Sequence, residues 1–505
     1  MTQPGQPPID RSEPAPSGAA GVGLDRWLRA ALILIVISHV AAFFYVTLQR
    51  VAYPFELEWM EGALVDHTAR VCRGEPIYTA PSVEHISFLY TPLYYYVSAV
   101  VSSFAGLGLF PLRLVSLSAS LGCALLIAYL VKKEAPGGGL TPAVVAGGFF
   151  LAGFWQVDGW HDLARNDSLF LLLILLTVAL LRGATDRRAL LAGAVVVLAF
   201  LAKQLTLALL PPLALAMACF SIRRAVLFTV STTVCLLVAV GLYSWLTDGW
   251  FFYYIFEVPS KHPQVAGIEF WWSDMRPLWI SLAVGAVWFL LGLGREDWRV
   301  TLFYAAVTAG LLASAYIARH HAGGHINALM PWLVGGGLLM GLSIQRFASR
   351  QPGLLASVMA VMVAQFAVMA GDPRSFLPSD EHGYEHARFH DYLGGVGGSV
   401  FVPCHGYVAQ AVGSESSMHG MAYFDLQSSQ TEPFNTLLKS IGQAYAERRY
   451  RVIVISEPHS GVFLGAGNKT IPGYRLLEDP PFDHQLMQPL HGMMTTPALV
   501  FERVD

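Results

Sequence analysis

The sequence predicts a mainly α-helical, polytopic membrane protein that ends in a small α/β domain outside the membrane. Two observations predict this fold class. Of the 505 residues, 54% are hydrophobic and only 13% are charged, whereas soluble domains carry about 25% charged residues. Long apolar runs recur as far as residue 370, and beyond it histidines and acidic residues become frequent. We therefore predict a disordered cytoplasmic tail at 1–23, a transmembrane domain at 24–371 and an extracytoplasmic α/β domain at 372–505.

The first apolar run, 30–47, follows Arg26 and Arg29 and lacks a small-residue cleavage site. We expect an uncleaved first span rather than a signal peptide. Further apolar runs lie at 112–131, 141–157, 166–181, 189–202, 204–220, 225–246, 277–294, 301–318, 328–344 and 353–370. Each is treated as one span, which predicts about eleven transmembrane helices.

Basic residues give the orientation of these spans. They recur at every second connection, as at Lys132 and Lys133 and again at Arg346 and Arg350. Because Lys and Arg concentrate in cytoplasmic loops, these connections and the N-terminus are predicted to be cytoplasmic. The protein is then a multi-pass protein of the plasma (inner) membrane, with the C-terminal domain outside and Lys203 at an external turn.

The apolar segment from Thr91 to Gly108 does not fit this order as a span, because counting it would move Lys132 and Lys133 outside. We expect an interfacial or re-entrant helix with tyrosines at headgroup level. A true second span, with one later span miscounted, is the alternative.

The outer region alternates short β-type runs with a helical segment. SVFVP at 399–403, RVIVIS at 451–456 and ALVF at 498–501 predict strands, and 436–449 predicts a helix. This pattern indicates a small α/β domain.

Charge and cysteine spacing exclude other classes. Lys and Arg total 32 and Asp and Glu total 35, a net charge of −3, so no nucleic-acid partner is predicted. The five cysteines show neither CxxC nor zinc-type Cys/His spacing, and no HExxH is present, so we predict no metal site of that kind.

Three carboxylates, Glu56, Glu58 and Glu61, follow the first span within six residues. If 59–72 is helical, Glu58 and Glu61 share a face. Crowded acids near low dielectric tend to have raised pKa values, which suits a general base, and they can also bind a divalent cation. An ordinary solvated loop is the alternative.

The second external loop carries Asp162, Arg165 and Asp167. A guanidinium binds phosphate oxygens bidentately, so Arg165 is a candidate for an anionic phosphate, with Asp167 or Asp162 beside the first-loop acids. A buried ion pair at a helix start is the alternative. Other polar candidates on this face are Lys203, Lys261, Arg319, His320, His325 and Asn327. A single Lys or His there can instead simply contact lipid headgroups.

The order of these motifs resembles the GT-C superfamily of polytopic glycosyltransferases, which includes protein O-mannosyltransferases, lipid A aminoarabinose transferases and oligosaccharyltransferase catalytic subunits. The motifs are the acidic loop with GEPIY at 74–78 and YTPLY at 90–94, a Leu-rich span ending in Lys-Lys, ARND at 164–167, AKQ at 202–204, and GGHINALMP at 323–331. The resemblance covers residues 25 to about 345. Family members usually carry Asp-Glu or Asp-x-Asp in the first loop, whereas this chain has Glu56-Leu-Glu58.

The resemblance implies an extracytoplasmic active site, a sugar donor carried on a polyprenyl phosphate, and an inverting transfer to a glycan, lipid or protein acceptor. Its base would be Glu58, with Glu61 as second choice, and Asp167 would belong to the catalytic group. The donor phosphate would meet Arg165, Lys203, Arg319 and His320. Substrate contacts would come from Glu56, Asp162, Lys261, His325 and Asn327. No cofactor is implied with certainty; a divalent cation is the open alternative.

Two other functions compete with the transferase. A transporter or lipid flippase would place its polar groups near the bilayer midplane and show an internal repeat. A membrane-anchored binding or assembly protein would do its work through the outer domain.

Overall fold

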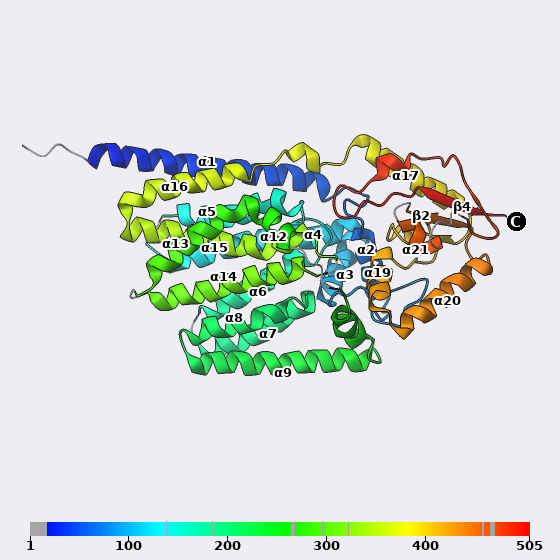
Figure 1. The fold of residues 1–505 in the computed structure, drawn as a ribbon, viewed down its shortest axis with the longest axis horizontal. Coiled ribbons are helices and arrows are strands. Elements are labelled where there is room, and N and C mark those ends of the chain that lie inside the picture. Colours follow the sequence, from blue (N-terminus) through cyan, green and yellow to red (C-terminus); the bar gives the residue numbers. More distant parts are fainter. Residues whose placement is uncertain are drawn as a thin grey trace, which may run out of the picture.

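A computed structural model describes residues 18–137, 139–183, 185–263, 268–294, 297–321, 323–456, 459–464 and 470–504. A bundle of helices forms one end of the elongated molecule, and the outer domain forms the other (Figure 1). Residues 1–17 of the predicted tail lie outside the described residues. The first helix begins at Gly18, within the segment predicted to be disordered.

Helices occupy all the predicted apolar runs. They are α1 (Gly18–Arg50), α4 (Leu109–Glu134), α5 (Thr141–Ala152), α6 (Asp167–Leu181), α7 (Asp186–Ala202), α8 (Thr206–Ala218), α9 (Ile222–Leu246), α13 (Trp279–Gly292), α14 (Trp298–Arg319), α15 (Met330–Arg350) and α16 (Pro352–Val368). In the described part of the chain, six helical spans are long and apolar enough to cross a membrane, or seven if the bent pair at 352–395 counts as one. Helices α5, α6 and α8 are shorter and apolar. The chain is therefore a multi-pass membrane protein, and the count of about eleven spans stays a prediction.

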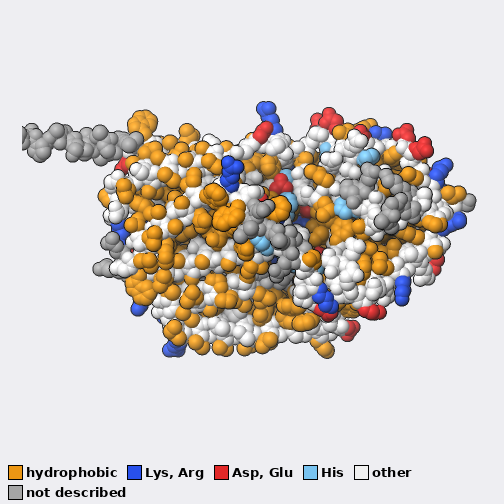
Figure 2. All heavy atoms as spheres, in the orientation of Figure 1, with side chains coloured by type: hydrophobic (Ala, Val, Ile, Leu, Met, Phe, Trp, Pro, Cys, Tyr) orange, Lys and Arg blue, Asp and Glu red, His pale blue; other side chains and the backbone are white. Residues whose placement is uncertain are grey.

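Helix α15 forms the centre of the bundle and packs against α5, α14, α13 and α16. Small residues allow the close approach to α5. A Cβ at Gly337 would lie 2.6 Å from the Ala146 carbonyl oxygen, and one at Gly341 would lie 2.7 Å from that of Pro142. Glycines at such contacts let membrane helices approach backbone to backbone. Hydrophobic side chains cover most of the bundle in Figure 2, whereas charged ones gather around the outer domain and at the bundle's far end.

The connection between α1 and α4, which the sequence predicts to be the first external loop, contains α2 (Glu61–Cys72) and α3 (Leu93–Ala105). Helix α3 corresponds to the doubtful apolar segment, and it packs against α2 and α4 beside the outer domain (Figure 1). Its 13 residues extend about 20 Å, which is short of the roughly 30 Å of a bilayer core. This length favours the interfacial or re-entrant helix over a second span.

The outer domain is built on a four-stranded sheet with strand order β1-β2-β4-β3. Strands β1 (Val400–Phe401) and β2 (Val452–Ile455) are parallel, whereas β4 (Leu499–Arg503) runs antiparallel to β2 and to β3 (Tyr474–Leu476). The three predicted strands and the predicted helix, α20 (Glu432–Ala446), are present; β3 was not predicted. The other helices of this domain are α17 (Asp380–Gly395), α18 (Val408–Ala411), α19 (Gly420–Ser429) and α21 (Ser460–Leu464).

Short helices lie in the connections. One aromatic segment contains α10 (Trp250–Phe252), a π-helix (Tyr253–Glu257), α11 (Val258–Ser260) and α12 (Ile268–Met275). Short 3-10 helices lie at Gly153–Val157, Arg276–Leu278, Ile326–Leu329, Pro373–Phe376 and His484–Met487.

The outer domain packs directly on the first external loop. The start of α2 crosses the segment before α18 so closely that a Cβ at Gly62 would lie 2.1 Å from the Gly406 carbonyl oxygen. Asp66 accepts hydrogen bonds from the Tyr407 amide at 2.8 Å and from the Gln410 side chain at 2.5 Å. These contacts make the acidic loop a boundary between the bundle and the outer domain.

Candidate active site

Glu58 and Arg165 bring together the two loops that the sequence predicts to be external. The chain leaves α1 irregularly at 54–60, and Glu58, which is only 1% exposed, lies just before α2. A guanidinium nitrogen of Arg165 is 3.1 Å from Glu58 Oε2, which also accepts a hydrogen bond from the Met60 amide at 3.3 Å. The sequence predicted that these loops share a face, and the ion pair places the two residues in contact.

Aromatic rings hold the other side of the Arg165 guanidinium. Its second terminal nitrogen donates to the Tyr90 hydroxyl at 2.7 Å, and the group lies over the rings of Tyr90 and Trp160 at 5.3 and 5.4 Å. Its Nε has no partner among the described residues. His325 packs against Trp160 with ring centroids 5.2 Å apart. Arg165 is therefore held in place while one donor remains unused.

Asp167 begins α6 and forms a second ion pair nearby. The Lys203 ammonium, at the turn between α7 and α8, is 2.5 Å from Asp167 Oδ1. The same oxygen accepts from the Asn327 amide at 3.2 Å, whereas Oδ2 has no partner among the described residues. The structure thus joins Asp167, Lys203 and Asn327, which come from three distant parts of the sequence.

Burial controls the protonation of the first-loop acids. Burial raises the pKa of Glu58 to about 7, although the Arg165 charge opposes this rise. Burial also raises the pKa of Glu56 well above its usual range, against a hydrogen bond from the Gly62 amide. Glu58 is thus poised to exchange a proton near neutral pH, as a general base requires.

Glu61 has a different environment. Arg113 binds both of its oxygens, at 2.8 and 2.6 Å, and the amides of Ala164 and Leu57 donate to them at 2.7 and 2.8 Å. Burial favours protonation, but the Arg113 charge and these hydrogen bonds outweigh it, so the pKa of Glu61 lies below its usual value. Its carboxylate is ionised and fully occupied in holding α4 and both external loops together.

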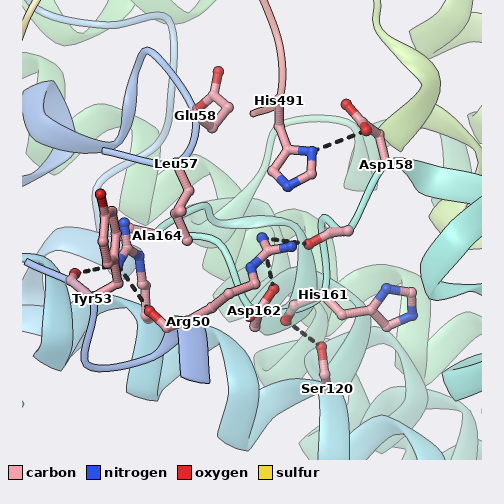
Figure 3. A network of polar contacts seen from close by, with 12 residues as sticks. Arg50, Tyr53, Leu57, Glu58, Ser120, Asp158, His161, Asp162, Ala164 and His491 are labelled. Carbon is pink, nitrogen blue, oxygen red and sulfur yellow. Dashed lines mark hydrogen bonds and ion pairs between the residues drawn. The ribbon is translucent and has the colours of Figure 1, made fainter. Parts of the chain in front are cut away.

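Asp162 also lies beneath the site in a buried pair. Arg50, the last residue of α1, extends below Leu57 to Asp162, and the two groups are 3.1 Å apart with no exposed surface (Figure 3). In the same view, His491 of the outer domain lies between Glu58 and Asp158, and it contacts the Asp158 carboxylate at 3.0 Å. The outer domain therefore reaches the edge of the site.

Other predicted residues are engaged elsewhere. Arg319 pairs with Asp274 at 2.5 Å, Lys261 is 43% exposed and pairs with Glu257, and His320 packs on Tyr316. Within the described ranges, no hydrogen bond or ion pair joins Arg319, Lys261 or His320 to Glu58, Arg165 or Asp167. The predicted set therefore divides into several buried pairs near Glu58 and Arg165 and three residues that are engaged elsewhere.

Several residues of the site were not predicted. Arg113 could have been found, because it is a charge within an apolar run, where charges are costly. His491 and Asp425 come from the outer domain; Asp425 lies against His262, and burial raises its pKa to about 8. No local pattern in the sequence marks them.

A metal centre is not formed by the described side chains. Among them, no group of three or more His, Cys, Asp or Glu residues has the arrangement to hold an ion. Glu58, Glu61 and Asp167 are each paired with a basic side chain instead.

The chain shares its fold with solved membrane glycosyltransferases of the GT-C class. One similar solved structure is ArnT from Cupriavidus metallidurans bound to undecaprenyl phosphate, with 12% identity over 94% of this chain and 98% of that chain and a TM-score of 0.58. The apo state of the same protein matches with 14% identity over 96% of this chain and 99% of that chain, also at a TM-score of 0.58. The apo oligosaccharyltransferase of Archaeoglobus fulgidus matches with 12% identity over 86% of this chain and 70% of that chain, at a TM-score of 0.51. No family model and no curated protein sequence matches. At these identities the likeness establishes the fold alone.

Proposed function

We propose that the protein is an integral membrane glycosyltransferase that moves a sugar from a polyprenyl-phosphate donor to an extracytoplasmic glycan, lipid or protein acceptor, with inversion. The observation that carries this proposal is the buried Glu58–Arg165 pair beside Lys203, at the end of the bundle that faces the outer domain. The shared fold supports it, since one similar structure, ArnT, is bound to undecaprenyl phosphate.

The basic residues would bind the donor phosphate. The unused Nε of Arg165 lies on the same side of the guanidinium as the terminal nitrogen that donates to Tyr90, so a phosphate that replaces the Tyr90 hydroxyl can bind through two parallel hydrogen bonds. Lys203 would add a second positive charge. Both stabilise the charge that develops on the phosphate as the bond from the anomeric carbon to the phosphate oxygen breaks.

Glu58 would accept the proton of the acceptor. The acceptor oxygen attacks the anomeric carbon from the side opposite the phosphate, its proton passes to Glu58, and the electron pair of the broken bond stays on the phosphate. A phosphate on Arg165 competes with the Glu58 carboxylate for the guanidinium. Donor binding therefore makes Glu58 more basic at the step that needs a base.

The remaining acids would position this pair. Glu61 has both oxygens bound by Arg113, and Asp162 is paired through Oδ1 with Arg50, so we propose them as positioning residues rather than as a base and a substrate contact. Asp167 would hold Lys203 and Asn327 in place. We assign no step to Lys261 or His320.

We infer that this end of the bundle is extracytoplasmic, in the plasma (inner) membrane, and that the N-terminus is cytoplasmic. The site and the outer domain lie at the same end of the bundle (Figure 1). The predicted cytoplasmic connections carry the pairs Arg182–Glu134 and Arg224–Asp186. The clustering of polar groups at helix ends disfavours a transporter or flippase, which would hold them near the midplane.

The proposal is tested with membranes that carry the protein and a panel of radiolabelled polyprenyl-phosphate sugars. We expect label from at least one donor to enter acceptor material with the wild type and with Glu75→Gln, a matched control in an exposed acid of the same loop. We expect none with Glu58→Gln. Transfer from no donor by folded wild-type protein would contradict the proposal.

A further inference from the structure

A cavity lies beside the acidic loop and is lined by Glu56, whereas neither Glu58 nor Arg165 lines it. It has a volume of about 340 Å³, within the range of small-ligand pockets. Its walls come from the chain after α1, the turn between α3 and α4, helix α17, and the segment before α18. Glu56 is the one member of the predicted site that lines it.

Aromatic rings and imidazoles form its inner wall. Phe55 stacks on His386 with ring centroids 5.2 Å apart and packs edge-on against His390 at 5.3 Å. The Tyr53 hydroxyl is fixed by His382 Nδ1 at 2.7 Å. His386 is 95% buried, and its Nε2 has no partner among the described residues. The wall therefore offers flat apolar faces together with an unused hydrogen-bonding group.

Glu56 lies at the base and leaves one oxygen available. Its Oε1 accepts from the Gly62 amide at 2.9 Å, whereas Oε2 is 3.7 Å from His405 Nδ1, beyond hydrogen-bond distance. Burial raises the pKa of Glu56 and lowers those of His386 and His390, so all three favour their neutral forms. No Lys, Arg or Asp lines this cavity among the described residues.

The mouth of the cavity is apolar. Leu107, in the turn between α3 and α4, and Phe110, in the first turn of α4, line it and are 37% and 41% exposed. Phe104 lies on α3, the short helix that the sequence predicts to lie at the membrane surface, and it is 89% exposed. The cavity thus opens beside the interfacial helix, where a ligand can keep an apolar part in lipid.

We propose that this cavity binds the uncharged saccharide head of a membrane lipid, whose chains leave past the turn between α3 and α4. Sugar C–H faces pack on Phe55 and Tyr53, and hydroxyls exchange hydrogen bonds with Glu56 and His386. An anionic head would find no lining cation. A purely apolar occupant would leave Glu56 Oε2 and His386 Nε2 buried without hydrogen-bond partners. The site is separate from the Glu58–Arg165 pair and does not depend on transfer.

The test is a titration of the full-length protein in detergent with a monohexosyl diacylglycerol, followed by native mass spectrometry. Ala105→Trp should fill the mouth and weaken binding at least about tenfold, and His386→Ala should weaken it by a similar factor through the lost hydrogen bond and the lost stacking on Phe55. Ser103→Trp, at an exposed position of the same helix but outside the cavity, is the matched control and should bind as the wild type.

Three comparisons decide the result. Phosphatidylglycerol should not compete with the glycolipid, and a free methyl hexoside should bind more weakly than the glycolipid. Glu58→Gln should bind the glycolipid normally, which separates this site from the proposed reaction. Equal binding by the wild type and Ala105→Trp would overturn the proposal, as would efficient competition by phosphatidylglycerol; equal binding of the free hexoside would overturn the lipid assignment.

Discussion

Glu58 titrates near neutral pH because it is buried beside a single guanidinium. Its pKa of about 7 is above the ordinary value of 4.5, so the folded protein holds this proton more tightly than the unfolded chain does. The contribution of Glu58 to the free energy of unfolding therefore falls as the pH rises between these two values. The protein therefore loses some of its free energy of unfolding at the pH where Glu58 becomes a base.

We predict that kcat/KM for transfer rises with pH through about 7, as Glu58 becomes a carboxylate. The measurement is a pH profile with a donor of fixed charge. Glu75→Gln should leave the profile unchanged. A profile of kcat/KM that is flat between about pH 5 and pH 8 would argue against a base of this pKa, because a single titration near 7 is mostly complete within about one pH unit on either side.

Arg165 depends on its planar shape as well as on its charge. Arg165→Lys keeps the charge but loses bidentate contacts and the packing on Tyr90 and Trp160. We predict a fall in kcat/KM of about 10²- to 10³-fold, measured with saturating acceptor. Arg73→Lys, in an exposed pair, is the control. Activity close to wild type in Arg165→Lys would remove this residue from phosphate binding.

At the scale of elements, two buried ion pairs connect the membrane helices to the loops: Arg50 of α1 pairs with Asp162, and Arg113 of α4 pairs with Glu61. Glu61→Gln leaves the Arg113 guanidinium buried without its counter-charge, and we expect a loss of about 3–5 kcal/mol in stability. Thermal unfolding in detergent measures this loss. The exposed Arg73–Glu75 pair should contribute less than about 1 kcal/mol, so Glu75→Gln should melt like the wild type. Equal melting temperatures for the two variants would contradict the structural role of Glu61.

The crossing of α2 with the segment before α18 makes a second prediction at this scale. Gly62→Ala would bring a Cβ to 2.1 Å from the backbone oxygen of Gly406, so the outer domain must shift from α2. We expect faster proteolysis of the outer domain and a lower melting temperature. Gly442→Ala, in an open position on α20, is the control and should be neutral or slightly stabilising. Unchanged proteolysis in Gly62→Ala would show that the two segments separate freely.

Elements with a strong local pattern could be predicted from the sequence. The membrane helices follow from apolar runs, and β2 follows from its β-branched residues Val452 to Ile455. Strand β3 could not be predicted, because its three residues have too little pattern and it forms only by pairing with β4. The same limit applies to the start of α1 at Gly18, where composition indicated a disordered tail.

The site was predictable in part for a similar reason. The distribution of Lys and Arg among the connections predicted that the two loops lie on one face of the membrane, and the structure pairs Glu58 with Arg165 between them. Spacing cannot show which of two neighbouring acids is enclosed by Arg113, nor that His491 packs against the acidic loop. Those facts depend on contacts between distant segments.

For the whole molecule, the outer domain completes the site instead of standing apart from it. The His491 amide donates to the Leu57 carbonyl at 3.0 Å, and His419 contacts the Trp59 carbonyl at 3.0 Å. The acidic loop is thus held from the bundle by Arg113 and from outside by these residues. Movement of the outer domain would alter the surroundings of Glu58.

The central claim is that Glu58 is the base of a transfer from a polyprenyl-phosphate sugar. Its most direct test measures both transfer and donor binding in purified wild type and Glu58→Gln. The account predicts that transfer falls by about 10²- to 10⁴-fold in the variant while the donor still binds, because Arg165 and Lys203 remain. Transfer at the wild-type rate by a folded Glu58→Gln protein would contradict it.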